Sequence, residues 1–175
     1  MKIKFDSNQD YQLDAIQSFV DLFDGQPLNK SDFSIELNKE VVEGQTSLFQ
    51  SELGIGNNLV LDDDTILKNL HIIQERNEID DTSAQQFSDN GLNFSAEMET
   101  GTGKTYVYLR TIFELSEKYG FKKFIIVVPS VAIREGALKN IEITSDHFKA
   151  LYNNLEFEYF VYDSKKPNRI RQFAS

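Results

Sequence analysis

The sequence predicts an α/β fold in which helices flank a parallel sheet, because segments typical of strands alternate with helical patterns along its second half. The expected strands cover 92–98, 123–128 and 156–162. Helical patterns at 104–118 and 131–141 lie between them, and a glycine-rich turn at 98–105 joins the first strand to the first helix. Strand–helix alternation of this kind favours a parallel sheet with right-handed crossovers.

The first half of the chain predicts two helices. Residues 10–24 place apolar side chains on one helical stripe, and Gly25 and Pro27 are expected to end this helix. The stripe consists of Tyr11, Ala15, Ile16, Phe19, Val20 and Phe23. A second helix is expected to start near Asp64, because the aspartates at 62–64 can cap free N–H groups and suit the positive end of a helix.

The rest of residues 28–91 carries weaker signals. Short apolar pieces at 31–37 and 58–61 are candidate strands, and the polar stretch 80–91 predicts a surface loop. We expect these residues to form an acidic insertion that follows the N-terminal helix.

The second half is more regular. The helix at 104–118 is expected to end at Gly120, and the apolar run at 123–128, which Pro129 ends, is typical of a strand buried on both faces. A helix over 131–141 and a separate short helix near 147–153 complete the expected elements.

Composition limits the class of protein. The 175 residues suffice for one domain, and 40% of them are hydrophobic, which is enough to build a core. The absence of cysteine excludes a disulfide framework, a thiolate metal site and a cysteine nucleophile. No apolar run reaches the length of a membrane span and the N-terminus has no hydrophobic signal region, so we expect a cytoplasmic protein without a membrane partner.

The net charge of −10 argues against nucleic acid only when the chain is taken as a whole. Residues 1–97 carry 19 acidic and 6 basic side chains, whereas residues 98–175 carry 9 acidic and 12 basic side chains. The two parts therefore predict different roles, and the second part remains compatible with an anionic partner.

The most specific motif is Met98-Glu99-Thr100-Gly101-Thr102-Gly103-Lys104-Thr105, which lies between an expected strand and an expected helix. Glycines at 101 and 103 allow successive backbone N–H groups to turn toward one anion. Lys104 suits the β- and γ-phosphates of a nucleotide, and the Thr105 hydroxyl suits Mg²⁺. The generic phosphate-loop pattern has glycine where this chain has Met98, so the strand and helix on either side carry the assignment.

The motif METGTGKT resembles motif I of superfamily 2 helicases and translocases. Tyr11-Gln12-Leu13-Asp14-Ala15-Ile16 resembles the glutamine motif of the same proteins, in which an amide offers adenine a donor and an acceptor. The segment VPSVAIREG at 128–136 resembles motif Ia, which contacts the nucleic-acid backbone. The residues of the three motifs together resemble the restriction (helicase–nuclease) subunit of Type III restriction-modification enzymes.

This resemblance implies a RecA-like motor domain that binds ATP and Mg²⁺. The implied nucleotide contacts are Gln12, Glu99, Thr100, Gly101, Thr102, Gly103, Lys104 and Thr105, with Lys104 as the catalytic residue and Thr105 toward the metal. Ser130 and Arg134 are the implied contacts to double-stranded DNA. The resemblance also implies a partner subunit that carries methyltransferase activity and specificity, and DNA cleavage by a region C-terminal to this chain.

These expectations divide the chain into an N-terminal helix with the glutamine motif at 1–27, the acidic insertion at 28–91 and the start of the motor domain at 92–175. The insertion either covers a sheet edge or docks a partner or DNA. No acidic box follows residue 136, so we interpret the chain as the opening of a longer ATPase that binds nucleotide weakly and does not hydrolyse it.

Two other functions stay open at this stage. The chain could be an interaction module whose phosphate loop is a remnant, or part of another superfamily 2 system such as a Type I restriction motor. His71 and His147 have no ligand partners at suitable spacing and are interpreted as structural. The basic residues Lys165, Lys166, Arg169 and Arg171 near Phe173 are interpreted as a solvated face rather than a DNA site.

Overall fold

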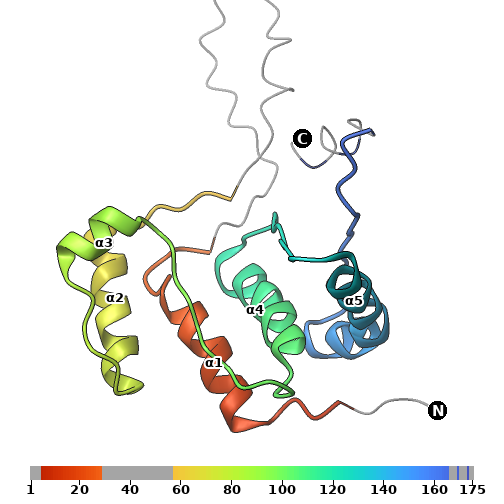
Figure 1. The fold of residues 1–175 in the computed structure, drawn as a ribbon, viewed down its shortest axis with the longest axis horizontal. Coiled ribbons are helices and arrows are strands. Elements are labelled where there is room, and N and C mark those ends of the chain that lie inside the picture. The colour runs from red at the N-terminus through yellow and green to blue at the C-terminus, as the bar shows by residue number, and fades with distance from the viewer. Residues whose placement is uncertain (1–4, 29–56, 166–168, 170–172, 174–175) are drawn as a thin grey trace, which may run out of the picture.

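The computed structural model describes residues 5–28, 57–165, 169 and 173, and within these ranges the chain forms five helices. They are α1 (Asp10–Asp21), α2 (Asp63–Arg76), α3 (Ala84–Asn90), α4 (Lys104–Tyr119) and α5 (Val131–Leu151). Figure 1 shows α2, α1, α4 and α5 side by side in that order, and each neighbouring pair is in contact. No helix in the described ranges is long and apolar enough to cross a membrane.

Helix α1 lies between α2 and α4 and buries its face against both. Ile16 and Val20 are buried as predicted, but Tyr11 is 50% exposed and Gln12 is buried instead. Ala15 and Phe23 of the predicted stripe pack against the same core, so Tyr11 is its clear exception. Tyr119 at the end of α4 is buried against α1, where its hydroxyl donates a hydrogen bond to the Val20 carbonyl at 3.0 Å.

A second core joins α4 to α5 and is largely aromatic. The Phe113 ring of α4 stacks on Phe148 of α5, with 4.8 Å between centroids, and on Tyr152 at 5.2 Å. Phe157 meets the same Phe113 ring edge-on at 5.1 Å and packs against this core. Stacked and edge-on aromatic pairs contribute beyond the area they bury, and they hold α5 against the helix that follows the phosphate loop.

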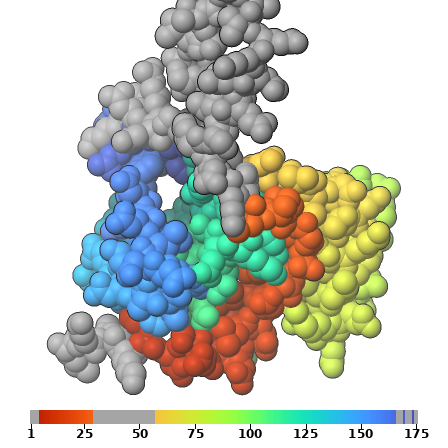
Figure 2. Space-filling view, turned by 180° about the vertical axis from the view of Figure 1, so that it is seen from behind, coloured from red at the N-terminus to blue at the C-terminus, as the bar shows by residue number. Residues whose placement is uncertain are grey.

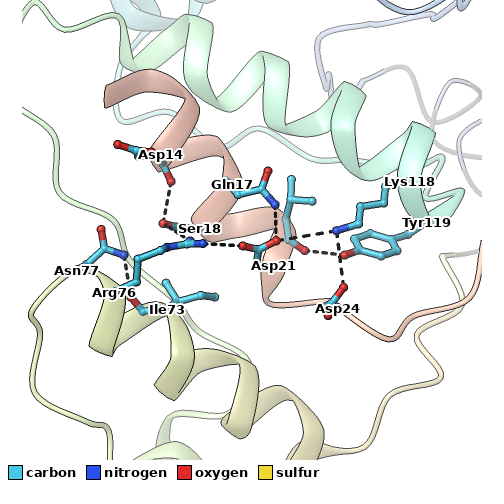
Figure 3. A network of polar contacts seen from close by, with 11 residues as sticks. Asp14, Gln17, Ser18, Asp21, Asp24, Ile73, Arg76, Asn77, Lys118 and Tyr119 are labelled. Atoms are coloured by element: carbon cyan, nitrogen blue, oxygen red, sulfur yellow. Dashed lines mark hydrogen bonds and ion pairs between the residues drawn. The ribbon is translucent and has the colours of Figure 1, made fainter. Parts of the chain in front are cut away.

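The part of the acidic region that the structure describes packs on α1 through polar contacts (Figure 3). Arg76 of α2 forms an ion pair with Asp21 at 2.9 Å, and Lys118 of α4 approaches the same carboxylate at 3.9 Å. The Asn69 amide donates to the carbonyls of Leu22 at 3.1 Å and Asp24 at 2.9 Å. Because exposed ion pairs stabilise weakly, the half-buried amide is the more specific link.

The space-filling view from behind shows the same order of surfaces, with α1 between the α2–α3 pair and α4 (Figure 2).

Two expected helix boundaries are confirmed. Helix α2 begins after Asp62, whose side chain accepts a hydrogen bond from the Thr65 N–H at 2.8 Å. Hydrogen bonding with Thr65, through its side chain first and its backbone N–H second, lowers the pKa of Asp62. Helix α4 ends at Gly120, which has a φ of 73° and so takes the left-handed conformation that glycine adopts without strain.

Two predictions about helices are wrong. The stretch 80–91 is not all loop, because Ser83 and Gln86 form a reciprocal capping box that starts α3. The expected break between 141 and 147 is absent, and α5 runs on to Leu151. Thr144 lies inside this helix, and its hydroxyl donates to the Asn140 carbonyl one turn earlier, at 2.6 Å.

The predicted parallel sheet is not formed by the described residues, none of which is in a strand. The segments 92–98, 123–128 and 156–162 are non-helical, and so is 58–61, whereas 31–37 lies outside the described residues. A strand exists only when a neighbouring backbone completes its hydrogen-bond ladder, and no such neighbour occurs in the described ranges. Ile125 and Val127 are consequently 77% and 87% exposed.

Candidate functional site

The glycine-rich loop takes a backbone conformation that only glycine adopts freely at two positions. Gly101 and Gly103 have φ values of 86° and 87°. Gly103 is also the N-cap of α4, and it offers no side chain to the free N–H groups of the first turn. Because the N–H groups of a first helical turn have no carbonyl partner within the helix, those of residues 104–106 remain available to an anion.

The loop is held closed on itself by its own side chains. The Thr102 hydroxyl donates to the Glu99 carbonyl at 2.7 Å, and the Lys104 amine donates to the same carbonyl at 3.0 Å. Lys104 therefore rests on a backbone oxygen that carries only a partial negative charge. A phosphate oxygen is a stronger acceptor, because hydrogen bonds between ionised groups are stronger than those to neutral acceptors.

Gln12 of α1 reaches the loop across 90 positions of sequence. Its amide nitrogen donates to the Thr102 carbonyl at 2.9 Å, and the side chain is buried. A Cβ atom on Gly103 would lie 2.6 Å from this nitrogen, whereas a Cβ on Gly101 would meet nothing within 4 Å. Glycine at 103 is thus favoured by its φ, and a side chain there would also displace the Gln12 amide.

An open pocket of about 590 Å³ lies at this point of the molecule. Its lining includes six residues predicted to contact a nucleotide, namely Gln12, Thr100, Gly101, Gly103, Lys104 and Thr105. Glu99 and Thr102, which were also predicted, do not line it and instead supply the carbonyls that hold Lys104 and Gln12. Pockets of about 300–1,000 Å³ are typical of small-molecule sites, so the volume suits a nucleotide.

Five further residues line the pocket that the motifs did not indicate: Phe5, Asp6, Gln9, Tyr106 and Asn140. Tyr106 directly follows the motif, and its position on α4 could have indicated it. Asn140 comes from α5 and carries no sequence signal that links it to the loop. Phe5, Asp6 and Gln9 precede the glutamine motif, so a wider reading of that motif would have included them.

Tyr106 is connected to α5 through His147. The Tyr106 hydroxyl and the His147 Nε2 atom lie 2.9 Å apart. Burial lowers the pKa of His147, and the positive charge of Arg110 lowers it further. The lowered pKa favours a neutral imidazole at pH 7, and the contact with Tyr106 agrees with the structural role interpreted from the sequence.

Ser130 and Arg134, the predicted DNA contacts, lie at the start of α5 and do not line the pocket. Ser130 is the N-cap of α5 and accepts a hydrogen bond from the Ile133 N–H at 3.3 Å. Arg134 forms an ion pair with its neighbour Glu135 at 2.8 Å. Of the basic residues near the C-terminal end, Lys166 and Arg171 lie outside the described residues.

Metal-binding side chains do not gather near the pocket. Across the described ranges, no three His, Asp or Glu side chains lie close enough together to hold a metal ion. Thr105 is the pocket residue whose hydroxyl suits Mg²⁺ that arrives with a nucleotide. This donor set fits a metal bound mainly by phosphates and water rather than a metal held by the protein alone.

Comparison with known proteins gives three curated relatives, all of them Res subunits of Type III restriction-modification enzymes. The StyLTI subunit of Salmonella typhimurium is 53% identical over 74 residues, which are 40% of this chain and 7% of that protein. The EcoPI subunit of Escherichia phage P1 is 36% identical over 101 residues, which are 57% of this chain and 10% of that protein. The EcoP15I subunit of Escherichia coli is 42% identical over 71 residues, which are 39% and 7% respectively.

The matched stretches span a tenth or less of the length of these relatives. A family model described as "Type III restriction enzyme, res subunit" matches residues 7–169, which include α1 to α5 and the phosphate loop between them. The chain therefore belongs to the family of Type III restriction enzyme Res subunits.

Proposed function

We propose that the chain binds the phosphates of ATP, together with Mg²⁺, on the loop that precedes α4. The observation that carries this proposal is the combination of two left-handed glycines, an uncapped helix start and Lys104 in one pocket with Gln12. A helix N-terminus with free N–H groups and a positive dipole favours an anion. Lys104 adds a full positive charge at the same place.

Lys104 is the residue that the phosphates would move. In this structure its amine donates to the Glu99 carbonyl, which lies five positions earlier. A bound triphosphate would draw the amine onto its β- and γ-oxygens, because attraction between opposite full charges exceeds attraction to a carbonyl. Thr105 would then present its hydroxyl to Mg²⁺, which neutralises phosphate charge when it is bound.

Gln12 is suited to an adenine amine. Its amide nitrogen is engaged by the Thr102 carbonyl at 2.9 Å and approaches the Tyr11 hydroxyl at 3.4 Å. Its carbonyl oxygen has no hydrogen-bond partner among the described residues, and this oxygen accepts hydrogen bonds only. In this arrangement Gln12 favours a purine with an amine at position 6, as in adenine, over one with an oxygen there, as in guanine.

The larger function proposed is that of the motor of a Type III restriction enzyme, which acts on double-stranded DNA with a methyltransferase subunit. Family membership and the names of the relatives support it. The contacts proposed for the DNA backbone are Ser130 and Arg134, whose guanidinium would exchange Glu135 for a phosphate. Replacing a phosphate-binding arginine should reduce the slope of the logarithm of DNA affinity against the logarithm of salt concentration by about one.

A parallel RecA-like sheet is proposed for the residues that surround this site in the whole motor domain. A second pocket, of about 520 Å³, is lined by apolar side chains of α4 and α5 and by the extended residues 155–160. The exposed Ile125 and Val127 lie in the non-helical segment that runs past it. Apolar surface of this kind favours coverage by further strands.

Nucleotide titration of the wild type and of Lys104→Ala tests the proposal. We expect Mg²⁺-dependent binding of ATP that weakens about tenfold or more in the variant, as expected for a lost charge-assisted contact. Lys139→Ala is the matched control, because Lys139 is an exposed lysine of α5 that pairs with Glu142. Equal binding by the wild type and Lys104→Ala would instead favour an interaction module with a remnant loop.

We also propose that the 175-residue chain binds ATP without hydrolysing it. The described residues contain no acidic cluster that could hold Mg²⁺ and activate water. Measured turnover by this chain that Lys104→Ala abolishes would contradict this part of the proposal.

A further inference from the structure

The segment that precedes α1, residues 5–9, forms one wall of the phosphate-loop pocket. We call it the strap, and we propose that Arg110 holds the strap in place for the nucleoside end of the bound nucleotide. This inference rests on the proposed function and adds a positioning residue to it. Arg110 contacts the strap, and the strap lines the pocket.

The pocket has a phosphate end and a remaining wall. Gly101, Gly103 and Lys104 line the first, whereas Phe5, Asp6 and Gln9 line the strap side. If the phosphates occupy the loop, the covalently attached nucleoside must extend toward the rest of the cavity. The strap is therefore the wall that the nucleoside meets.

The strap depends on α4 for its position. An Arg110 Nη1 group donates a hydrogen bond to the Ser7 carbonyl at 2.6 Å, across 103 positions of sequence. Of the strap's hydrogen bonds within the described residues, this one alone reaches beyond α1. The Phe5 ring adds apolar contact with Tyr106, at 6.2 Å between centroids, and with His147 at 5.3 Å.

Arg110 is itself held rigidly. Its side chain is only 12% exposed, and its Nε atom lies 3.3 Å from the Tyr152 hydroxyl and 3.5 Å from the Glu114 carboxylate. The Tyr152 hydroxyl donates to that carboxylate at 2.6 Å, which closes the arrangement. A guanidinium with fixed donors on several sides can serve Ser7 and Tyr152 together, which the single ammonium of a lysine cannot do.

This arrangement links both ends of the ligand to one helix. Lys104 begins α4 and Arg110 lies on the same helix less than two turns later. A displacement of the strap would therefore change the nucleoside wall while the phosphate loop stays as it is. Arg110 then acts on affinity for the nucleoside part and not on affinity for phosphate.

The test compares two ligands, Mg²⁺–ATP and inorganic triphosphate, by titration of the 175-residue chain. Arg110→Met removes the donors, and Arg110→Lys keeps the charge. Arg76→Met is the control, because Arg76 pairs with Asp21 and neither residue lines the pocket. We expect Arg110→Met to bind ATP about tenfold more weakly and triphosphate within about twofold of the wild type. Arg110→Lys should recover only part of the loss.

Other outcomes separate this inference from the proposed function. If Arg110→Met weakens ATP and triphosphate by the same factor, Arg110 supports the fold in general and the inference is overturned. If Arg110 variants do not fold, Phe5→Ala carries the test, because it alters the half-buried end of the strap and leaves the α4–α5 core residues unchanged. Selective loss of ATP affinity in Phe5→Ala supports the inference, and equal loss contradicts it. If the wild type binds neither ligand, the proposed function fails and the inference with it.

Discussion

Replacing Gly103 by alanine tests how the phosphate loop is built. Gly103 has a φ of 87° and Gly101 a φ of 86°, so alanine is strained at both positions. Only at 103 would the new Cβ meet an obstacle, the Gln12 amide nitrogen at 2.6 Å. Gly101→Ala is therefore a matched control that carries the backbone strain without the collision.

The two substitutions should differ by the value of one hydrogen bond. A left-handed conformation costs a non-glycine residue about 1–2 kcal/mol. At position 103 the Gln12 side chain must also move, which breaks its hydrogen bond to the Thr102 carbonyl and adds about 0.5–1.5 kcal/mol. We expect Gly101→Ala to lower the free energy of unfolding by about 1–2 kcal/mol and Gly103→Ala by about 1.5–3.5 kcal/mol.

Urea denaturation followed by circular dichroism gives the free energy of unfolding of each variant. The decisive comparison repeats both glycine substitutions in a Gln12→Ala background, where the obstacle and its hydrogen bond are absent. The difference between the two positions should then vanish, as a double-mutant cycle measures. An unchanged difference in that background would show that Gln12 does not press on Gly103 and would refute the reasoning.

Three further substitutions test helix capping, the α1–α4 contact and the His147 environment. Ser130→Ala should destabilise the chain by about 1 kcal/mol through loss of the α5 cap, whereas Ser130→Asp should retain the cap; equal losses in urea denaturation would count against the cap. Tyr119→Phe should cost about 1 kcal/mol because it removes the donor to the Val20 carbonyl, and the same change at the exposed Tyr162 should cost nothing measurable; equal effects would contradict this contact. The folded-state pKa of His147 lies below its ordinary value of 6.5, so the unfolded chain binds more protons and stability is lost as the pH falls below about 6.5. His147→Gln should remove this loss of stability when urea denaturation is compared at about pH 7.5 and 5.5. The same pH dependence in both proteins would argue against the lowered pKa of His147.

Local sequence signals predicted where helices begin and end, but they predicted the tertiary structure less well. The aspartate cap of α2 and the glycine end of α4 depend on neighbouring residues alone, so the sequence indicated both. Helix α3 had a readable signal in Ser83 and Gln86 that the polar composition of its surroundings obscured. Helix α5 runs without a break through Thr144, a residue of low helix propensity, and local composition did not reveal this continuity.

The sheet could not be predicted as reliably as the helix ends. An apolar, β-branched run indicates burial, but it does not say which backbone lies beside it. Residues 123–128 have the pattern of a central strand, and in the described residues no second strand pairs with them. Pairing depends on segments that are remote in sequence, whereas a cap or a helical stripe is local.

The candidate site shows the same distinction. The loop motif identified Gly101, Gly103 and Lys104 because their roles follow from their own backbone and charge. The hydrogen bond from Gln12 to the loop spans 90 positions, and only the resemblance to a known motif predicted that Gln12 and the loop share a site. Arg110 and its contact with Ser7 carried no sequence signal, because a single arginine on a helix is usually a surface residue.

The most direct test of phosphate binding by the loop is to observe its backbone amides while a nucleotide binds. Amide ¹H–¹⁵N spectra of the chain would be recorded during titration with Mg²⁺ and a non-hydrolysable ATP analogue. We predict that the amide signals of residues 101–106 change most, because left-handed glycines and an uncapped helix start leave N–H groups there for phosphate. Binding that leaves these amides unchanged, or that perturbs chiefly α2 and α3, would contradict the assignment of this loop as the phosphate site.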